Sequence, residues 1–296
     1  MFSGQNRPVL LATDGTDEAV GAVAVGAALA RATLTSLRML SVLEPASYSF
    51  AGVDPAGSAA DAAAESEDEG RIRRTVTSQV AAVLGDDAAR EVHFARGRVV
   101  PTIVAESRKA GAGLILLGLH PHDIIARLAG EETALRVART AELPVLCVTP
   151  TLRHLPRHIL AAVDFSPASV RAAREALGLA PAGSTLTLVH VRPQTSDRNA
   201  PNSRANYSSG VGDALARLEQ SLAGEYPVTI KSVTLEGAPV PELLNYALQT
   251  GAELIALGTH RHSLVGRLML GSVATDLLRA ATLSVFIVPP APRAVG

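Results

Sequence analysis

The stretch Ala110-Gly-Ala-Gly-Leu-Ile-Leu-Leu-Gly-Leu-His-Pro-His-Asp123 returns further along the chain as Thr250-Gly-Ala-Glu-Leu-Ile-Ala-Leu-Gly-Thr-His-Arg-His-Ser263. The two copies keep one register, which continues through the apolar runs 143–148 and 283–288. A register held over so many residues indicates a duplicated module and not a chance motif. We therefore predict two tandem domains, over residues 1–150 and 151–296, joined by a short linker at 150–157.

Composition limits the functional classes. The chain has 296 residues, 47% of them apolar, which is enough for two hydrophobic cores. Its 27 basic side chains are balanced by 28 acidic ones and 3% of its residues are aromatic, so nucleic acid is not an expected partner. No apolar run approaches the ~20 residues that span a bilayer. The single cysteine, Cys147, lies in an apolar run. We predict a soluble, cytoplasmic protein with no membrane contact, disulfide or redox cofactor.

Each half alternates strands and helices in the same order. It opens with a buried strand that ends in an acid, Asp14 or Asp164, and an Ala-rich helix and a second strand follow. Polar surface loops are then expected over 45–70 and 193–212, with the acidic run 65–69 at a helix entrance.

The later elements follow the same pattern. Glycines at 111 and 251 are expected to stop two of the helices. The predicted helices are 71–84, 101–110, 213–223 and 241–250, the predicted strands are 90–95, 114–117, 228–235 and 254–257, and each half closes with one more helix and strand. Buried strands that alternate with helices predict an α/β fold of two doubly wound domains, each with a parallel sheet of about five strands flanked by helices.

The carboxyl ends of the strands carry the candidate chemistry. Ligands of such sheets bind at this edge, where the strand order reverses, and Asp164 and Gly258 each follow or end a strand there. Gly271-Ser272 opens a later helix, whose free backbone amides and hydroxyl suit phosphate. Arg261 and Arg267 add positive charge nearby, and Asp164 suits a ribose or an adenine amino group.

Taken together, these residues resemble the universal stress protein family. The resemblance rests on the openings 14–16 and 164–167, on Leu188-Val-His-Val191 and on the run from Gly258 to Ser272, and it covers almost the whole chain as a tandem of two domains. It implies a fold that binds ATP or another adenine nucleotide, with or without magnesium. Carried over by position, adenosine contacts fall on Asp164 and Val191, and phosphate contacts fall on Gly258, Gly271 and Ser272. The loop between Gly258 and Gly271 adds four further candidate contacts: Thr259, His260, Arg261 and Arg267.

Both halves depart from the phosphate-binding pattern of that family. In the second half the middle glycine is replaced by Arg261, whose side chain would either pair with phosphate or fill the space for it. In the first half Pro121 stands at that place, and two carboxylates replace Gly-Ser. Because carboxylates repel an anionic ligand, ATP is expected only in the second half. The degenerate site of the first half comprises Asp14, Val42, Gly118, Glu131 and Glu132.

Two other kinds of site are compatible with the sequence. The pairs His120/His122 and His260/His262, the first with Glu131 and Glu132 nearby, could form a zinc site, although polar loop histidines explain them more simply. His190 occurs in one half only, with Ser41 at the matching place, which favours a structural role. The sequence holds no nucleophile elbow, no Walker A loop and no Ser-Gly-Gly loop, so no catalytic residue is predicted, and slow hydrolysis of a bound nucleotide would lack an identifiable general base.

The sequence therefore predicts a regulatory module in a stress response that binds nucleotide without dedicated turnover. The alternatives are an interaction scaffold without nucleotide and a metal-binding protein. In the family the last strands of two domains pair, so strands 145–148 and 285–288 are expected to make one chain a pseudo-dimer. A homodimer and further protein partners are compatible with this arrangement.

Overall fold

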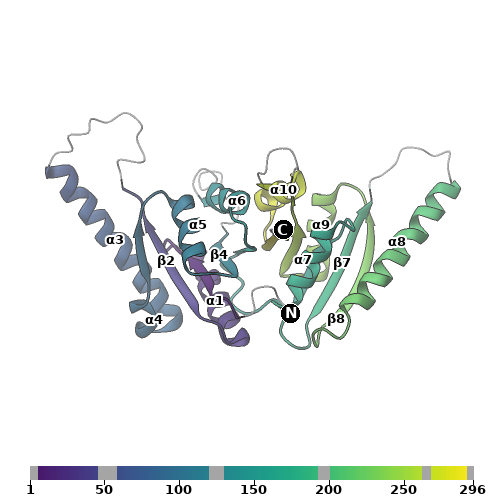
Figure 1. Ribbon diagram of the computed structural model, residues 1–296, viewed down its shortest axis with the longest axis horizontal. Helices are drawn as coiled ribbons and strands as arrows, with labels where there is room; N and C mark the ends of the chain where they lie inside the picture. Colours follow the sequence, from purple (N-terminus) through teal and green to yellow (C-terminus); the bar gives the residue numbers. More distant parts are fainter. Residues whose placement is uncertain (1–5, 46–58, 120–129, 193–200, 262–267, 292–296) are drawn as a thin grey trace, which may run out of the picture. The chain divides into compact units, whose positions relative to one another are not determined.

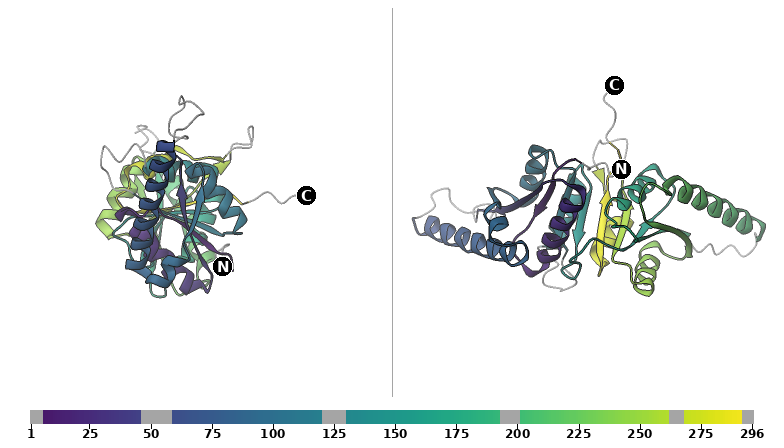
Figure 2. Two further views of the ribbon diagram at one scale, coloured as in Figure 1. Left: turned by 90° about the vertical axis from the view of Figure 1, so that its left-hand side faces the viewer. Right: turned by 90° about the horizontal axis from the view of Figure 1, so that it is seen from below.

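The computed structural model describes residues 6–45, 59–119, 130–192, 201–261 and 268–291. The chain divides into two compact units, Gly4–His154 and Leu155–Gly296. Figures 1 and 2 show the helices and strands of each unit from three directions.

The first unit contains one parallel sheet with the strand order β3-β2-β1-β4-β5. Its elements are β1 (Val9–Ala12), η1 (Asp17–Ala19), α1 (Val20–Thr33), β2 (Leu37–Leu43), α3 (Ala59–Leu84), α4 (Asp86–Arg90), β3 (His93–Arg96), α5 (Val99–Lys109), β4 (Leu114–Gly118), α6 (Gly130–Thr140) and β5 (Val145–Val148).

The second unit repeats this topology, with the order β12-β9-β6-β7-β8 and every strand of that sheet parallel. Its elements are β6 (His158–Ala162), α7 (Pro167–Leu177), β7 (Thr185–Arg192), α8 (Pro201–Leu222), β8 (Thr229–Glu236), α9 (Pro239–Thr250), β9 (Leu254–Gly258), β10 (His260–Arg261), β11 (Leu268–Met269), α10 (Ser272–Ala280) and β12 (Ser284–Val288).

The order of the strands explains why helices cover both faces of each sheet. In the first unit the connections through α1 and α3 lead from β1 to β2 and β3, away from β4. The connection through α5 leads back past β1 to β4, and that through α6 continues in the same direction to β5, so right-handed crossovers put the two pairs of helices on opposite faces. The packing of α1 on α3, and of α5 on α6, agrees with this (Figure 1). The central strands β1, β4, β6 and β9 are almost entirely buried. The predicted α/β fold of two doubly wound domains is confirmed.

The prediction of polar loops over 45–70 and 193–212, before α3 and α8, is wrong in part. Helix α3 already begins at Ala59 and α8 at Pro201, inside the segments expected to be loops. Alanine is the strongest helix former, and the start of α3 is rich in it, so helix propensity outweighs the polar composition there. In α8, Val211 lies inside the predicted loop but is buried together with Leu215, Leu218 and Leu222, so an apolar stripe extends the helix toward its amino end.

The acidic run 65–69 consequently lies within α3 and not at its entrance. Glu69 is the member with a partner on another element: Arg96 of β3 donates from Nε and Nη2 to its two carboxylate oxygens over 2.7 and 2.8 Å. The hydrogen bond from Arg96 holds the pKa of Glu69 below its usual value. This acid therefore fastens α3 to the neighbouring strand, which the sequence pattern did not predict.

Candidate functional site

The candidate site of the second unit lies where its strand order reverses, between β6 and β9. These strands pair in parallel, with Ala161 opposite Ala256, so Asp164 and Gly258 meet at the same edge of the sheet. Asp164 is exposed, and its Oδ1 accepts a 3.0 Å hydrogen bond from the backbone amide of Ser166. Because this bond fixes the turn into α7, the carboxylate stands at a defined place on the edge.

The start of α7 explains why position 258 is a glycine. A Cβ at Gly258 would lie 2.3 Å from the carbonyl carbon of Ala168 and 2.6 Å from the amide nitrogen of Ser169. In the first unit a Cβ at Gly118 would lie 2.9 Å from Cα of Ala19. Gly258 thus lets the start of α7 approach the end of β9, and Gly118 lets η1, which leads into α1, approach the end of β4.

Beyond Gly258 the chain forms a small hairpin. Thr259 is buried, and its amide donates to the carbonyl of Val288 over 3.0 Å. His260 and Arg261 then form β10, which pairs antiparallel with β11. The hairpin was not predicted, and it places the backbone of Arg261 in a ladder. His262 and Arg267 lie outside the described residues.

Helix α10 begins directly after this hairpin. Gly271 is its N-cap, with an extended φ of −60° and ψ of 162°, and no side chain of the described residues caps it. Gly271 and Ser272 are exposed. The first amides of a helix have no partner within the helix, so they are available to an anion at this end. The predicted helix start at Gly271-Ser272 is thus present.

The end of β7 brings two rings to the same edge. His190 is buried, its Nδ1 lies 2.8 Å from the carbonyl oxygen of Val163, and its ring centroid lies 5.0 Å from that of Phe165. Phe165 takes a left-handed conformation, with φ of 63°. Val191, the predicted adenosine contact, follows His190 and is partly exposed. These contacts give His190 the structural surroundings expected from the sequence.

The first unit has the same scaffold with different residues at the edge. Asp14 is exposed, and its Oδ1 accepts from the amide and the hydroxyl of Thr16 over 3.0 and 2.7 Å. Val42 lies in β2 and is partly exposed, as Val191 is in β7. Glu131 and Glu132 are the second and third residues of α6, so they occupy the helix start that Gly271-Ser272 occupies in the second unit. The structure therefore places carboxylate residues where the second unit presents uncapped amides.

The predicted histidine pairs lie largely beyond the described chain. His120 and His122 are outside it, and His260 is placed only by its backbone in β10. Among the described residues, no group of three His, Cys, Asp or Glu side chains is arranged to hold a metal ion.

Burial raises the pKa of Cys147 to about 12, so this thiol is not a nucleophile at neutral pH. Within the described ranges, no helix is both long and apolar enough to cross a membrane.

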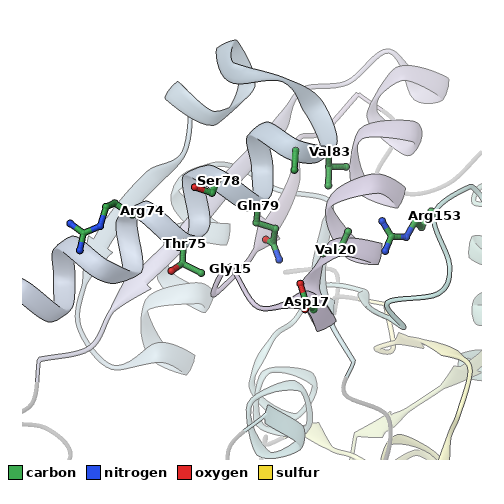
Figure 3. A pocket seen from close by; sticks show the side chains of 10 residues that line it. Gly15, Asp17, Val20, Arg74, Thr75, Ser78, Gln79, Val83 and Arg153 are labelled. Carbon is green, nitrogen blue, oxygen red and sulfur yellow. The ribbon is translucent and has the colours of Figure 1, made fainter.

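Sequence reasoning missed a groove in the first unit, between the start of α1 and α3, with a volume of about 650 Å³. Its lining includes Arg74 and Arg153, which lie far apart in the sequence and carry no shared motif (Figure 3). Only the folded chain brings them together.

Comparisons with known proteins agree with the fold. The model of the "Universal stress protein family" matches residues 5–149 and 156–289. A universal stress protein of Methanocaldococcus jannaschii is 34% identical over 76 residues, which are 26% of this chain and 44% of that relative, so the match spans less than half of the relative's length.

Two solved structures are similar over nearly the whole chain. A universal stress protein from Archaeoglobus fulgidus DSM 4304 has a TM-score of 0.63 at 17% identity, with 97% of this chain and 100% of that chain covered. A functionally unknown protein from Pseudomonas aeruginosa PAO1 has a TM-score of 0.59 at 20% identity, with 96% and 92% covered. At these identities the likeness supports the fold alone. With two repeats of the family model covering most of its length, the chain belongs to the universal stress protein family.

Proposed function

We propose that the second unit binds an adenine nucleotide at the edge formed by β6, β9 and α10, and that the protein acts as a regulatory module without dedicated turnover. The observation that carries the proposal is the exposed, uncapped start of α10 at Gly271-Ser272, at the edge of the sheet that also bears Asp164. Free amides at a helix start favour phosphate, and an exposed carboxylate suits the hydroxyls of a ribose.

The contrast between the two units supports this assignment. At the equivalent helix start the first unit carries Glu131 and Glu132, whose negative charge opposes a phosphate. Both positions lie at the start of the helix that precedes the last strand of their unit, α6 in the first unit and α10 in the second, and the residues there differ in charge. We therefore assign nucleotide to the second unit, with adenosine at Asp164 and Val191 and phosphate at Gly271 and Ser272.

The experiment exchanges the two helix starts. ATP binding by the full chain is measured by isothermal titration calorimetry, with and without Mg²⁺. The double variant Gly271→Glu, Ser272→Glu is expected to lose binding by a factor of at least about 100, because two carboxylates replace two phosphate contacts. Its matched control is Gly271→Ala, Ser272→Ala, which removes the hydroxyl but adds no charge and should weaken binding by less.

The outcomes separate the candidate functions. Saturable binding of one ATP per chain, lost in the double Glu variant, supports the proposal. Binding that persists in that variant moves the nucleotide elsewhere, and no binding by the wild type leaves the interaction scaffold as the function. A phosphate-release assay at saturating ATP tests the absence of turnover.

A further inference from the structure

The groove of the first unit lies between α1 and α3, beside the turn that follows Asp14. It has a volume of about 650 Å³, within the range typical of small-molecule sites. Four segments contribute its lining: the turn after β1 together with η1, the start of α1, one side of α3, and the chain that follows β5. The lining residues that bear on binding are Asp17, Val20, Arg74, Ser78, Val83 and Arg153.

Tight backbone packing fixes one wall. A Cβ at Gly15, whose φ is 82°, would lie 2.8 Å from the amide nitrogen of Val76, so α3 rests directly on this turn. The buried side chain of Gln79 accepts a 2.7 Å hydrogen bond from Oγ1 of Thr13 and donates to the carbonyl of Thr16. These contacts join α3 to the turn after β1, so the floor of the groove is set before any ligand arrives.

A second close approach places Arg153. A Cβ at Gly21 of α1 would lie 2.1 Å from the carbonyl oxygen of Thr149 and 2.9 Å from that of Leu152. The segment after β5 therefore lies against α1, with Leu152 buried and Arg153 exposed beside the groove. This contact brings a cation from the end of the unit to a groove made by its beginning.

The two arginines stand at opposite ends of the groove (Figure 3). Arg74 and Val83 are nine residues apart on α3, about 14 Å at the rise of an α-helix, and Arg153 lies beyond Val83 in the view. Neither guanidinium forms an ion pair or hydrogen bond with a residue that the structure describes. Both arginines are exposed.

Between the arginines the lining changes from polar to apolar. Ser78 follows Arg74 by one helical turn and adds a hydroxyl, whereas Val20 and Val83 form an apolar stretch toward Arg153. Among the described residues of the lining, Asp17 is the one acid. A ligand that matches the order cation, apolar stretch, cation along the groove has an anionic group, an apolar body and a second anionic group.

We propose that this groove binds an elongated organic dianion, with one carboxylate or phosphate group held by Arg74 and Ser78 and the other by Arg153. The apolar body lies over Val20 and Val83. Guanidinium groups favour both kinds of anion through paired hydrogen bonds, so the two arginines define the class of ligand.

The second unit lacks the features that form the groove. Phe165 stands at the position of Gly15, takes the same left-handed conformation, and turns its ring onto His190. Pro167 stands at the position of Asp17. The proposed site is thus specific to the first unit, which is also the unit with carboxylates at its degenerate nucleotide site.

The test uses the full chain and two probes in isothermal titration calorimetry: biphenyl-4,4′-dicarboxylate and the corresponding bisphosphate. Saturable binding of either is expected, and the better probe identifies the anionic group. Arg74→Gln and Arg153→Gln should each weaken it by about tenfold, as expected for the loss of a charge-assisted hydrogen bond. Asp17→Asn should tighten binding, since it removes a repelling charge, and Arg31→Gln, an exposed arginine of α1 outside the lining, should change nothing.

Several results would overturn the proposal. They are no saturable binding of either probe, an affinity unchanged in either arginine variant, or equal binding of biphenyl-4-carboxylate, which has one anionic group only. Repeating the titration with excess ATP separates this site from the nucleotide site. Unchanged affinity supports a separate groove, whereas displacement by ATP places the probe at the strand edge and refutes the groove.

Discussion

Gly258→Ala tests whether the glycine at the end of β9 is required by packing. The added Cβ would lie 2.3, 2.4 and 2.6 Å from three backbone atoms at the start of α7. Ordinary carbon contacts are about 3.5–4.0 Å, so strand and helix must separate by roughly 1 Å. Overpacking of this kind costs about 1–3 kcal/mol, and because backbone on both sides must move we expect the upper end, about 3 kcal/mol.

Two other glycines serve as controls because the structure ranks them. Gly118→Ala meets its nearest backbone atom at 2.9 Å, so a smaller cost of about 1–2 kcal/mol is expected. Gly271→Ala meets nothing within 4 Å and has a negative φ, so only the weaker N-cap preference of alanine applies, below about 1 kcal/mol.

Urea unfolding followed by tyrosine fluorescence suits this series. Of the 4 tyrosines, Tyr207, Tyr226 and Tyr246 lie in the second half, so the signal reports mainly on that unit. Far-ultraviolet circular dichroism then follows both units. If Gly258→Ala costs no more than Gly271→Ala, the reasoning from close backbone approach is refuted.

Three further predictions concern other sites. Because Arg96 holds the pKa of Glu69 below its ordinary 4.5, the pair stabilises the fold above that pH. Glu69→Gln should therefore destabilise the fold at pH 7, and this loss of stability should shrink as the pH falls below 4.5. Equal effects of the substitution at pH 7 and pH 3 would contradict this. Cys147, with its pKa raised to about 12, should react with a thiol reagent only after urea unfolds the chain, and its contribution should lower stability as the pH rises above 9.0. His190→Ser, which installs the residue of the first half, should cost about 1–3 kcal/mol in unfolding free energy because it leaves the Val163 carbonyl unpaired. An unchanged free energy of unfolding would refute a stabilising role for this hydrogen bond.

Most of the fold follows from local patterns in the sequence. Uninterrupted apolar runs gave the strands, and the glycines expected to end α5 and α9 do so, with Gly111 and Gly251 at φ of 61° and 65°. The errors arose where tertiary packing or propensity outweighs polarity. The buried Val211 extends α8 into a segment that reads as a polar loop, and alanines do the same for α3.

The candidate sites divide in a similar way. The helix start at Gly271-Ser272 could be predicted from the sequence, because the same two residues provide the N-cap and the amides and hydroxyl expected to bind phosphate. The groove could not be predicted, because Arg153 reaches it only through the contact of the segment after β5 with Gly21. Contacts between residues more than a hundred positions apart leave no local pattern. The same holds for Gly258, whose packing against α7 no spacing rule reveals.

Gly15 and Phe165 hold one backbone conformation in the two units, yet they are not interchangeable parts. Phe165 shows that the positive φ alone accommodates a large side chain. At position 15 the neighbouring helix α3 is therefore what excludes a side chain. An engineer who grafts the turn of one repeat onto the other must therefore transplant α3 along with it. The smallest portable fragment of this duplicated protein is a turn together with the helix that covers it.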